Sequence, residues 1–210
     1  MAIAVGIIIA YILGSIPTAV WLGKALYGID VREHGSQNPG ATNTFRVLGK
    51  KAGVMVMLGD IIKGMLAASL AIPLMKMGLV SESNLIITKI VFGIVAVFGH
   101  IFSVFLNFKG GKGVATLLGM MIAIQYEVAL ISVAIFIVTL LLSKYVSLAS
   151  IVSAFAFPVV LWFVPRFKTT EPLLILFGFI LFIVILWTHH KNIRRIIDGE
   201  ERKTYLIRRR

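Results

Sequence analysis

The sequence contains no cysteine among its 210 residues. Disulfide bonds, thiolate catalysis and metal sites with cysteine ligands are therefore excluded. Charged residues are also scarce, at 14% of the chain, and only nine residues are acidic against 21 lysines and arginines. With 59% hydrophobic residues and a mean hydropathy of +0.96, the chain has too much apolar surface to face water. The composition predicts an integral membrane protein.

Several catalytic signatures are missing as well. The sequence has no G-x-S-x-G nucleophile elbow, and Gly110-Gly111-Lys112-Gly113 lacks the spacing and the Ser or Thr of a Walker A loop. A covalent acyl-enzyme and an ATPase are therefore not expected. No linker, repeat or low-complexity segment interrupts the chain, so we expect one polytopic domain over residues 1–210.

Apolar runs predict an all-α bundle of about seven transmembrane helices, since a helix needs roughly 20 residues to cross the hydrocarbon. The stretch 114–143 fits either one long helix or two short ones broken at Gln125-Tyr126-Glu127. The distribution of positive charge favours two short helices here. A single long helix would give six crossings and put the basic tail from Lys191 outside. The predicted spans are about 2–23, 53–76, 85–106, 114–125, 128–143, 146–164 and 172–188.

The N-terminus is predicted outside and the C-terminus in the cytoplasm. The first span, Ala2 to Leu22, has no basic segment before it, and positive charge follows at Lys24 and Arg32, opposite to a cleavable signal peptide. The formal charge of +12 is then topology signal and attraction to anionic membrane lipids. A nucleic-acid partner is not expected, because no soluble domain presents stacking aromatics.

Two polar, glycine-rich segments stand out in this apolar chain. They are Gly35 to Asn43 and Phe108 to Gly113. Glycine lets backbone N–H groups approach a phosphate, Ser, Thr and Asn add neutral donors, and Arg46, Lys109 and Lys112 add positive charge. Polar backbone in a membrane protein persists only where protein or a watery cavity satisfies it, so both segments are interpreted as phosphate sites.

Short motifs follow one another in a fixed order along nearly the whole chain. They are Gly14-Ser15-Ile16-Pro17, then Gly35-Ser36-x-Asn38-x-Gly40-Ala41-Thr42-Asn43-x-x-Arg46, then Gly99-His100 leading to Phe108-Lys109-Gly110-Gly111-Lys112-Gly113-Val114-Ala115-Thr116, then Tyr145-Val146-Ser147-Leu148-Ala149-Ser150, and His189-x-x-Asn192-Ile193-x-Arg195. Each motif alone is weak, but the ordered set resembles the bacterial acyl-phosphate:glycerol-3-phosphate acyltransferase family.

The resemblance implies a seven-helix enzyme of the bacterial plasma (inner) membrane with its active site on the cytoplasmic face. Such an enzyme transfers a fatty acyl group from acyl-phosphate to the 1-hydroxyl of glycerol 3-phosphate, giving lysophosphatidic acid, the first step of phospholipid synthesis. It uses no metal or other cofactor, and an acyl-phosphate-producing enzyme is its functional partner. The resemblance assigns glycerol 3-phosphate to Ser36, Arg46, Lys109, His189 and Asn192, and the acyl-phosphate to Asn38, Gly40, Ala41, Thr42, Asn43 and Ser147.

The catalytic residues implied are His189 and Asn192. His189 is either a general base or a donor that positions a phosphate; a histidine three residues before Asn192 lies on the same helical face, and the family favours positioning, with a substrate phosphate assisting proton removal. A secondary transporter of a phosphorylated solute is the alternative function, although no inverted repeat is found in the sequence.

Five further polar residues call for an interpretation. Asp60 and Lys63 are expected to neutralise each other as an i,i+3 pair. Lys89 is expected to snorkel to the interface. His100 fits a satisfied core histidine and an active-site contact about equally, and Glu201 is interpreted as an anchor of the helical tail.

Overall fold

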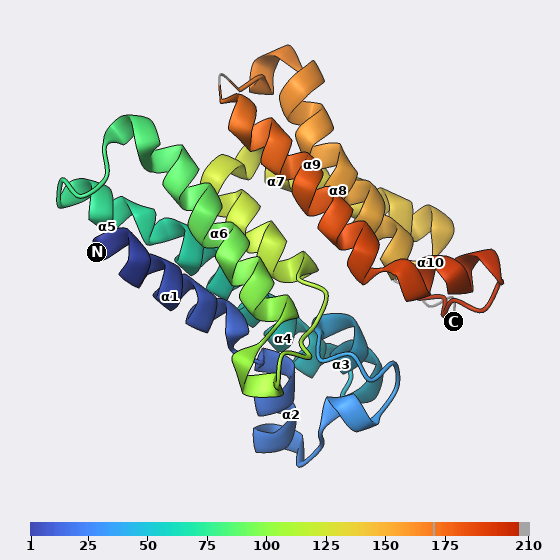
Figure 1. The fold of residues 1–210 in the computed structure, drawn as a ribbon. Coiled ribbons are helices and arrows are strands. Elements are labelled where there is room, and N and C mark those ends of the chain that lie inside the picture. Colours follow the sequence, from blue (N-terminus) through green and yellow to red (C-terminus); the bar gives the residue numbers. More distant parts are fainter. Residues whose placement is uncertain (170, 206–210) are drawn as a thin grey trace. The chain divides into compact units, whose positions relative to one another are not determined.

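The computed structural model describes residues 1–169 and 171–205, so the last arginines of the predicted basic tail lie outside the described residues. The regular elements of the described residues are all helices, as the sequence predicted (Figure 1). Contacts between residues divide the chain into two compact units, Met1–Ile124 and Gln125–Arg210. The predicted single-domain organisation stays a prediction.

Unit 1 is built on α1, α4 and α6, which lie side by side in Figure 1. Small side chains line their contacts: Ala10, Ala67 and Ala96 are fully buried around Phe92. Lipid tails are as apolar as the helix side chains, so burying apolar surface against another helix gives little gain. Close packing of small side chains stabilises the contact between the helices instead. The elements are α1 (Ala2–Ser15), α2 (Thr18–Tyr27), η1 (Val31–Glu33), α3 (Ala41–Val47), α4 (Lys50–Ser69), α5 (Ala71–Lys76), η2 (Glu82–Asn84), α6 (Leu85–Ile101), η3 (Val104–Leu106) and the start of α7 (Val114–Ser143).

The first predicted span is broken into two helices. α1 ends at Ser15, α2 begins at Thr18, and the two are bent by 44°. Pro17 causes the break, because proline has no N–H to donate and its ring disfavours helix in the residue before it. The carbonyl groups at the break must therefore find other partners.

Unit 2 contains the rest of α7, α8 (Val146–Phe163), η4 (Pro165–Phe167), α9 (Pro172–Thr188) and α10 (His190–Ile197). α8 and α9 pack together along their length, with Phe155 and Phe182 5.0 Å apart between ring centroids. α9 continues into α10 after a bend of 61°. This bend carries His189 at the junction of the two helices.

The backbone of α7 leaves the helical region at Gln125, with φ −146° and ψ 78°. A break was expected at this point. Among the described residues, four helices are long and apolar enough to cross a membrane, or up to six if each bent pair is one span, with Val114–Ser143 as one of them. The structure supports a multi-pass membrane protein, while the count of seven stays a prediction.

Lys89 differs from its prediction. Its Nζ donates a hydrogen bond to the carbonyl of Ala123 at 3.0 Å, instead of extending to the membrane surface. Ala123 lies just before the break in α7, where a backbone carbonyl loses its partner in the helix. The half-buried position of the lysine is explained by this carbonyl.

Candidate functional site

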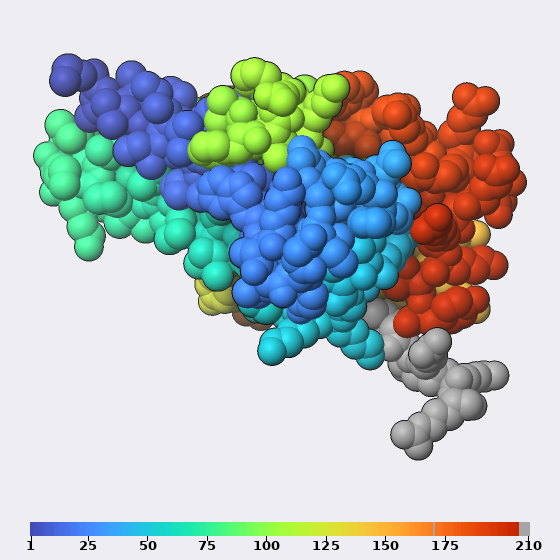
Figure 2. Space-filling model, turned by 90° about the horizontal axis from the view of Figure 1, so that it is seen from below, coloured from blue at the N-terminus to red at the C-terminus, as the bar shows by residue number. Residues whose placement is uncertain are grey.

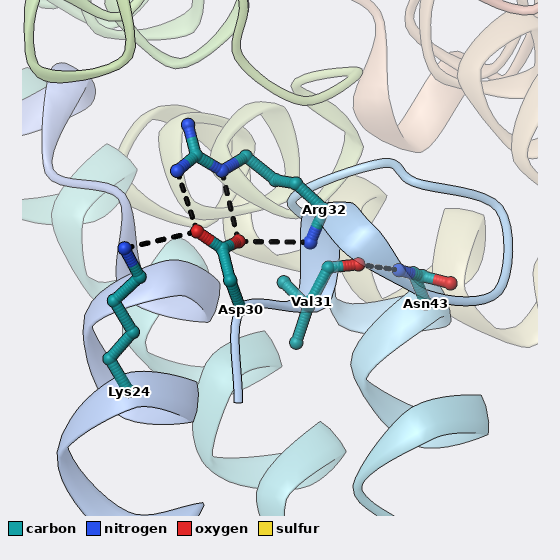
Figure 3. Close-up of polar contacts among 5 residues, drawn as sticks. All are labelled: Lys24, Asp30, Val31, Arg32 and Asn43. Atoms are coloured by element: carbon teal, nitrogen blue, oxygen red, sulfur yellow. Dashed lines mark hydrogen bonds and ion pairs between the residues drawn. The ribbon is translucent and has the colours of Figure 1, made fainter. Parts of the chain in front are cut away.

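The first polar segment folds around the side chain of Asn43. Its Oδ1 accepts the N–H of Ser36 at 2.8 Å, and its Nδ2 donates to the carbonyls of Val31 at 2.7 Å and His34 at 3.1 Å. Figure 3 shows the bond to Val31. Asn43 is almost fully buried, and Gly35 has φ +65° and no room for a Cβ beside Oδ1. This amide therefore closes the loop from the inside.

The same loop begins at a buried carboxylate that sequence reasoning missed. Asp30 accepts hydrogen bonds from the guanidinium of Arg32 at 2.6 and 3.0 Å, and Lys24 lies 3.1 Å away (Figure 3). The bond from Arg32 lowers the pKa of Asp30 well below its usual range, against the effect of burial, which would raise it. The D-x-R spacing was a usable signal, since it lets both side chains meet across a short turn.

A short helix that the sequence did not predict follows this loop. α3 begins after Gly40, so the N–H groups of Ala41, Thr42 and Asn43 lie in its first turn without partners inside the helix. Asn38 precedes it, and its carbonyl accepts the N–H of Gly40 at 2.9 Å. These five residues are the set expected for the acyl-phosphate in unit 1, and the structure brings them together on one segment.

The second polar segment uses two of its glycine N–H groups internally. Gly110 donates to the carbonyl of Ile101 at 2.9 Å and Gly111 to that of His100 at 3.1 Å. These carbonyls belong to the last turn of α6, so the glycines cap the C-terminus of that helix. A Cβ at Gly110 would collide with the carbonyl oxygen of His100. The interpretation of these two N–H groups as a phosphate cradle was wrong, because close packing is what requires glycine here.

The residues expected to hold glycerol 3-phosphate in unit 1 are on the surface. Ser36, Arg46 and Lys109 are all exposed. Figure 2 shows that α2 and the polar segment after it (blue) lie against the start of α4 (cyan). Exposed cations of this kind attract anionic ligands.

In unit 2, Glu201 gathers three side chains around one buried carboxylate. Its Oε1 accepts from Ser147 Oγ at 2.8 Å and from Asn192 Nδ2 at 2.7 Å, and its Oε2 accepts from Arg195 Nε at 2.8 Å. Burial alone would raise the pKa of Glu201, but these hydrogen bonds outweigh burial and lower it. The interpretation of Glu201 as an anchor of the tail is confirmed.

Ser147 and Asn192 were expected to contact different substrates. The structure joins both to one oxygen of Glu201, which fixes the start of α8 to α10. These hydrogen bonds hold both side chains in fixed orientations.

His189 lies beside this cluster at the bend between α9 and α10. It is almost fully buried, and its Nδ1 lies 2.8 Å from the carbonyl of Ile185. A carbonyl only accepts, so Nδ1 carries the proton in this hydrogen bond. The N–H of Asn192 donates to the carbonyl of His189 at 2.8 Å, which keeps the two residues in register.

Among the described residues, no group of three or more histidine, aspartate or glutamate side chains is arranged to hold a metal ion. What the site offers is cations, amides and hydroxyls. Such groups bind and orient phosphates.

Comparison with known proteins agrees with this chemistry. Residues 4–199 match the glycerol-3-phosphate acyltransferase family. A glycerol-3-phosphate acyltransferase of Chlorobium phaeobacteroides (strain BS1) is 41% identical, with 93% of each chain covered. One from Fusobacterium nucleatum subsp. nucleatum is 42% identical, covering 97% of this chain and 98% of its own.

Solved structures are similar as well. The crystal structure of PlsY (YgiH), an integral membrane glycerol 3-phosphate acyltransferase, in its glycerol 3-phosphate form has a TM-score of 0.85 and 35% identity. Its lysophosphatidic acid form has a TM-score of 0.82 at the same identity. Both comparisons cover 98% of this chain and 96% of the other.

The helices and polar segments thus define a multi-pass membrane protein of the acyltransferase class. The chain belongs to the glycerol-3-phosphate acyltransferase family. The resemblance seen in the ordered motifs is confirmed.

Proposed function

We propose that this chain transfers a fatty acyl group from acyl-phosphate to the 1-hydroxyl of glycerol 3-phosphate and forms lysophosphatidic acid. One observation carries the proposal. The chain is similar over nearly its whole length to one enzyme solved in a glycerol 3-phosphate form and in a lysophosphatidic acid form. The second molecule is the first with one acyl group added, so the pair is an acceptor and its product.

The choice of acyl-phosphate as donor rests on the chemistry of the reaction. The 1-hydroxyl oxygen attacks the carbonyl carbon, the new C–O ester bond forms, and the bond from that carbon to the phosphate oxygen breaks. Inorganic phosphate leaves with the electron pair, and the hydroxyl proton passes to a phosphate oxygen. Phosphate is a good leaving group, so the protein needs only to bind and orient the two substrates.

Glycerol 3-phosphate is assigned to Arg46, Lys109 and Ser36 in unit 1 and to His189 and Asn192 in unit 2. The two cations supply charge for the phosphate, and hydrogen bonds to a charged group contribute roughly 1.5–3 kcal/mol each. Ser36 adds a neutral donor. His189 and Asn192 position the nucleophile and are the catalytic residues of the proposal.

The phosphate of the donor is assigned to Asn38, Gly40, Ala41, Thr42 and Asn43, with Ser147. The first turn of α3 offers backbone N–H groups, which favour an anion. Asn43 takes part through its backbone N–H, because both hydrogens of its side-chain amide are used inside the loop. The hydroxyl of Ser147 donates its one hydrogen to Glu201 in this structure, so it has to turn away from Glu201 to donate to the phosphate.

His189 acts as a positioning donor in this proposal, and a substrate phosphate takes the proton. To donate to a substrate, the ring needs a hydrogen on Nε2 as well as the one that Nδ1 shares with Ile185. The bond from Nδ1 to the carbonyl of Ile185 supports a fixed ring. A fixed ring serves a general base equally well, so a substitution has to separate the two roles.

We further propose that the chain works as a single polytopic domain with seven crossings in the bacterial inner membrane. The break at Gln125 supports two crossings within Val114–Ser143, and the excess of Lys and Arg on one set of loops supports a cytoplasmic active site. The partner is an enzyme that produces acyl-phosphate.

Cysteine labelling tests this topology, since the chain has no cysteine of its own. Single cysteines at Gln37 or Lys191 should react only with a reagent on the cytoplasmic side. A cysteine at Ser81 or Thr169 should react only from the other side. Labelling of the variant at Lys191 from outside would refute the seven-crossing topology.

Proteoliposomes separate the acyltransferase from the alternative transporter. Vesicles that contain the purified chain receive glycerol 3-phosphate outside, with or without acyl-phosphate, and both lipid product and internal solute are measured. The proposal requires lysophosphatidic acid only when acyl-phosphate is present. Uptake of glycerol 3-phosphate with no acylated product would contradict it and favour transport.

A further inference from the structure

Unit 1 holds a charge pair that the proposed reaction does not use. Lys63 Nζ and Asp60 Oδ1 lie 2.9 Å apart on α4, with 6% and 3% of their side chains exposed. The pair lies inside a helix long and apolar enough to cross the membrane. Ionised groups are costly at such a position, so their presence calls for a role beyond packing.

The pair is bonded to the broken span between α1 and α2. Lys63 Nζ donates to the carbonyl of Ile16 at 2.8 Å, and Thr18 Oγ1 donates to Asp60 at 3.0 Å. The break at Pro17 leaves such carbonyls without helical partners. The charge pair therefore fixes both ends of the break to α4.

His100 connects the pair to the second polar segment. Its Nδ1 lies 3.8 Å from Asp60 Oδ1, and its side chain is 8% exposed. The other edge of the ring faces Gly111, because a Cβ at Gly111 would collide with Nε2. The carbonyl of His100 also accepts the N–H of Gly111. The ring is thus held between the carboxylate and the turn that follows Lys109.

We infer that Asp60, Lys63 and His100 are positioning residues that hold Lys109 in place for glycerol 3-phosphate. They act through the turn at Gly110 and Gly111, and they touch no substrate. The inference rests on the proposed role of Lys109. A merely structural role would lower the yield of folded protein but leave the KM for glycerol 3-phosphate unchanged in the protein that folds.

The test removes both charges together in Asp60→Asn/Lys63→Met, because removing one would leave a lone buried charge. Purified folded protein is assayed for the KM of each substrate. We expect the KM for glycerol 3-phosphate to rise about tenfold and that for acyl-phosphate to change less than about twofold. Lys89→Met is the matched control, since it removes a lysine that donates to a backbone carbonyl elsewhere in unit 1, and its KM values should equal those of the wild type.

A second comparison asks whether the pair acts through Lys109. Lys109→Ala is measured alone and in the Asp60→Asn/Lys63→Met background. If the network positions Lys109, the combined variant has a KM within about twofold of Lys109→Ala alone, because nothing remains to be positioned. If the combined variant instead shows the product of the two separate increases in KM, the inference is overturned while the assignment of Lys109 stands. An unchanged KM in Lys109→Ala itself would overturn that assignment, and the inference with it.

His100→Gln keeps the proposal testable if the double variant does not fold. It retains the carbonyl that accepts from Gly111 but replaces the ring between Asp60 and the turn. The KM for glycerol 3-phosphate should rise at least about threefold, with the KM for acyl-phosphate unchanged. If each substrate has the same KM in His100→Gln as in the wild type, the inference is overturned.

Discussion

Asn43→Asp tests the loop that carries most of the proposed acyl-phosphate contacts. The substitution keeps the size of the side chain and the oxygen that accepts from Ser36. It replaces the Nδ2 group, which donates to two carbonyls at 2.7 and 3.1 Å, by an oxygen that cannot donate when ionised. In the variant, a carboxylate oxygen therefore faces the carbonyl oxygens of Val31 and His34 in a buried position.

The free-energy cost of the substitution follows from these hydrogen bonds. Two lost hydrogen bonds account for about 1–3 kcal/mol, and the unpaired carbonyls and buried carboxylate raise the total to about 3–5 kcal/mol. Even 3 kcal/mol is worth about a hundredfold in the equilibrium between closed and open loop. We expect kcat/KM for acyl-phosphate to fall at least about tenfold and cleavage of segment 34–43 by added protease to become faster.

His34→Gln is the control for this experiment, because its exposed side chain is changed while its carbonyl still accepts from Asn43. It should leave the protease resistance of the loop unchanged. Wild-type protease resistance and wild-type kcat/KM in Asn43→Asp would refute the account of Asn43 as the closing residue.

Three other predictions follow from the charges and donors of the site. Lys109→Ala should raise the KM for glycerol 3-phosphate about tenfold to more than a hundredfold, since a charged hydrogen bond of roughly 1.5–3 kcal/mol is lost, while Lys168→Ala should have no effect; equal KM values in the two variants would contradict this. His189→Gln should retain substantial turnover if positioning is its role, and near-complete loss of kcat with substrate binding intact would make His189 the general base. Because the pKa of Glu201 is lowered in the folded protein, its stabilising effect is present above the ordinary pKa of a glutamate, about 4.3, and is lost as the pH falls through the lowered value. Melting temperatures across pH 3–7 should therefore fall more steeply in the wild type than in Glu201→Gln, and parallel curves would refute the assignment.

The fold class could be predicted because lipid imposes strong constraints on a sequence. Apolar runs and scarce acids act locally, so composition and spacing are enough to find the helices, although the break at Pro17 inside the predicted span 2–23 was not expected. The break at Gln125 could also be expected, since polar residues interrupt an apolar run there. The number of crossings could not be fixed, because bent helices and full spans have the same composition.

The site could be predicted only in part, because side-chain partners depend on segments distant in sequence. Asn43 was chosen as a phosphate ligand from its motif, but its amide closes the loop over Val31 and His34. Gly110 and Gly111 were chosen as N–H donors, but they cap α6. A glycine required for close packing and a glycine required for anion binding look alike in a sequence.

Contacts between residues far apart in the sequence were harder still to predict. Asp60 and Lys63 were expected to pair, since their spacing shows it, but no local pattern indicates that Lys63 reaches the carbonyl of Ile16, 47 residues earlier. The same is true of Glu201, which accepts from Ser147 54 positions away. Such contacts exist only once the helices have packed.

The most direct test of the account is the stoichiometry of the reaction with purified protein. Acyl-phosphate and glycerol 3-phosphate are mixed with the chain in detergent, without metal ions, and lysophosphatidic acid is measured by mass alongside released inorganic phosphate. The account predicts equal amounts of the two products, and no product when acyl-CoA replaces acyl-phosphate. Product formed from acyl-CoA, or phosphate released without lysophosphatidic acid, would contradict direct transfer from acyl-phosphate.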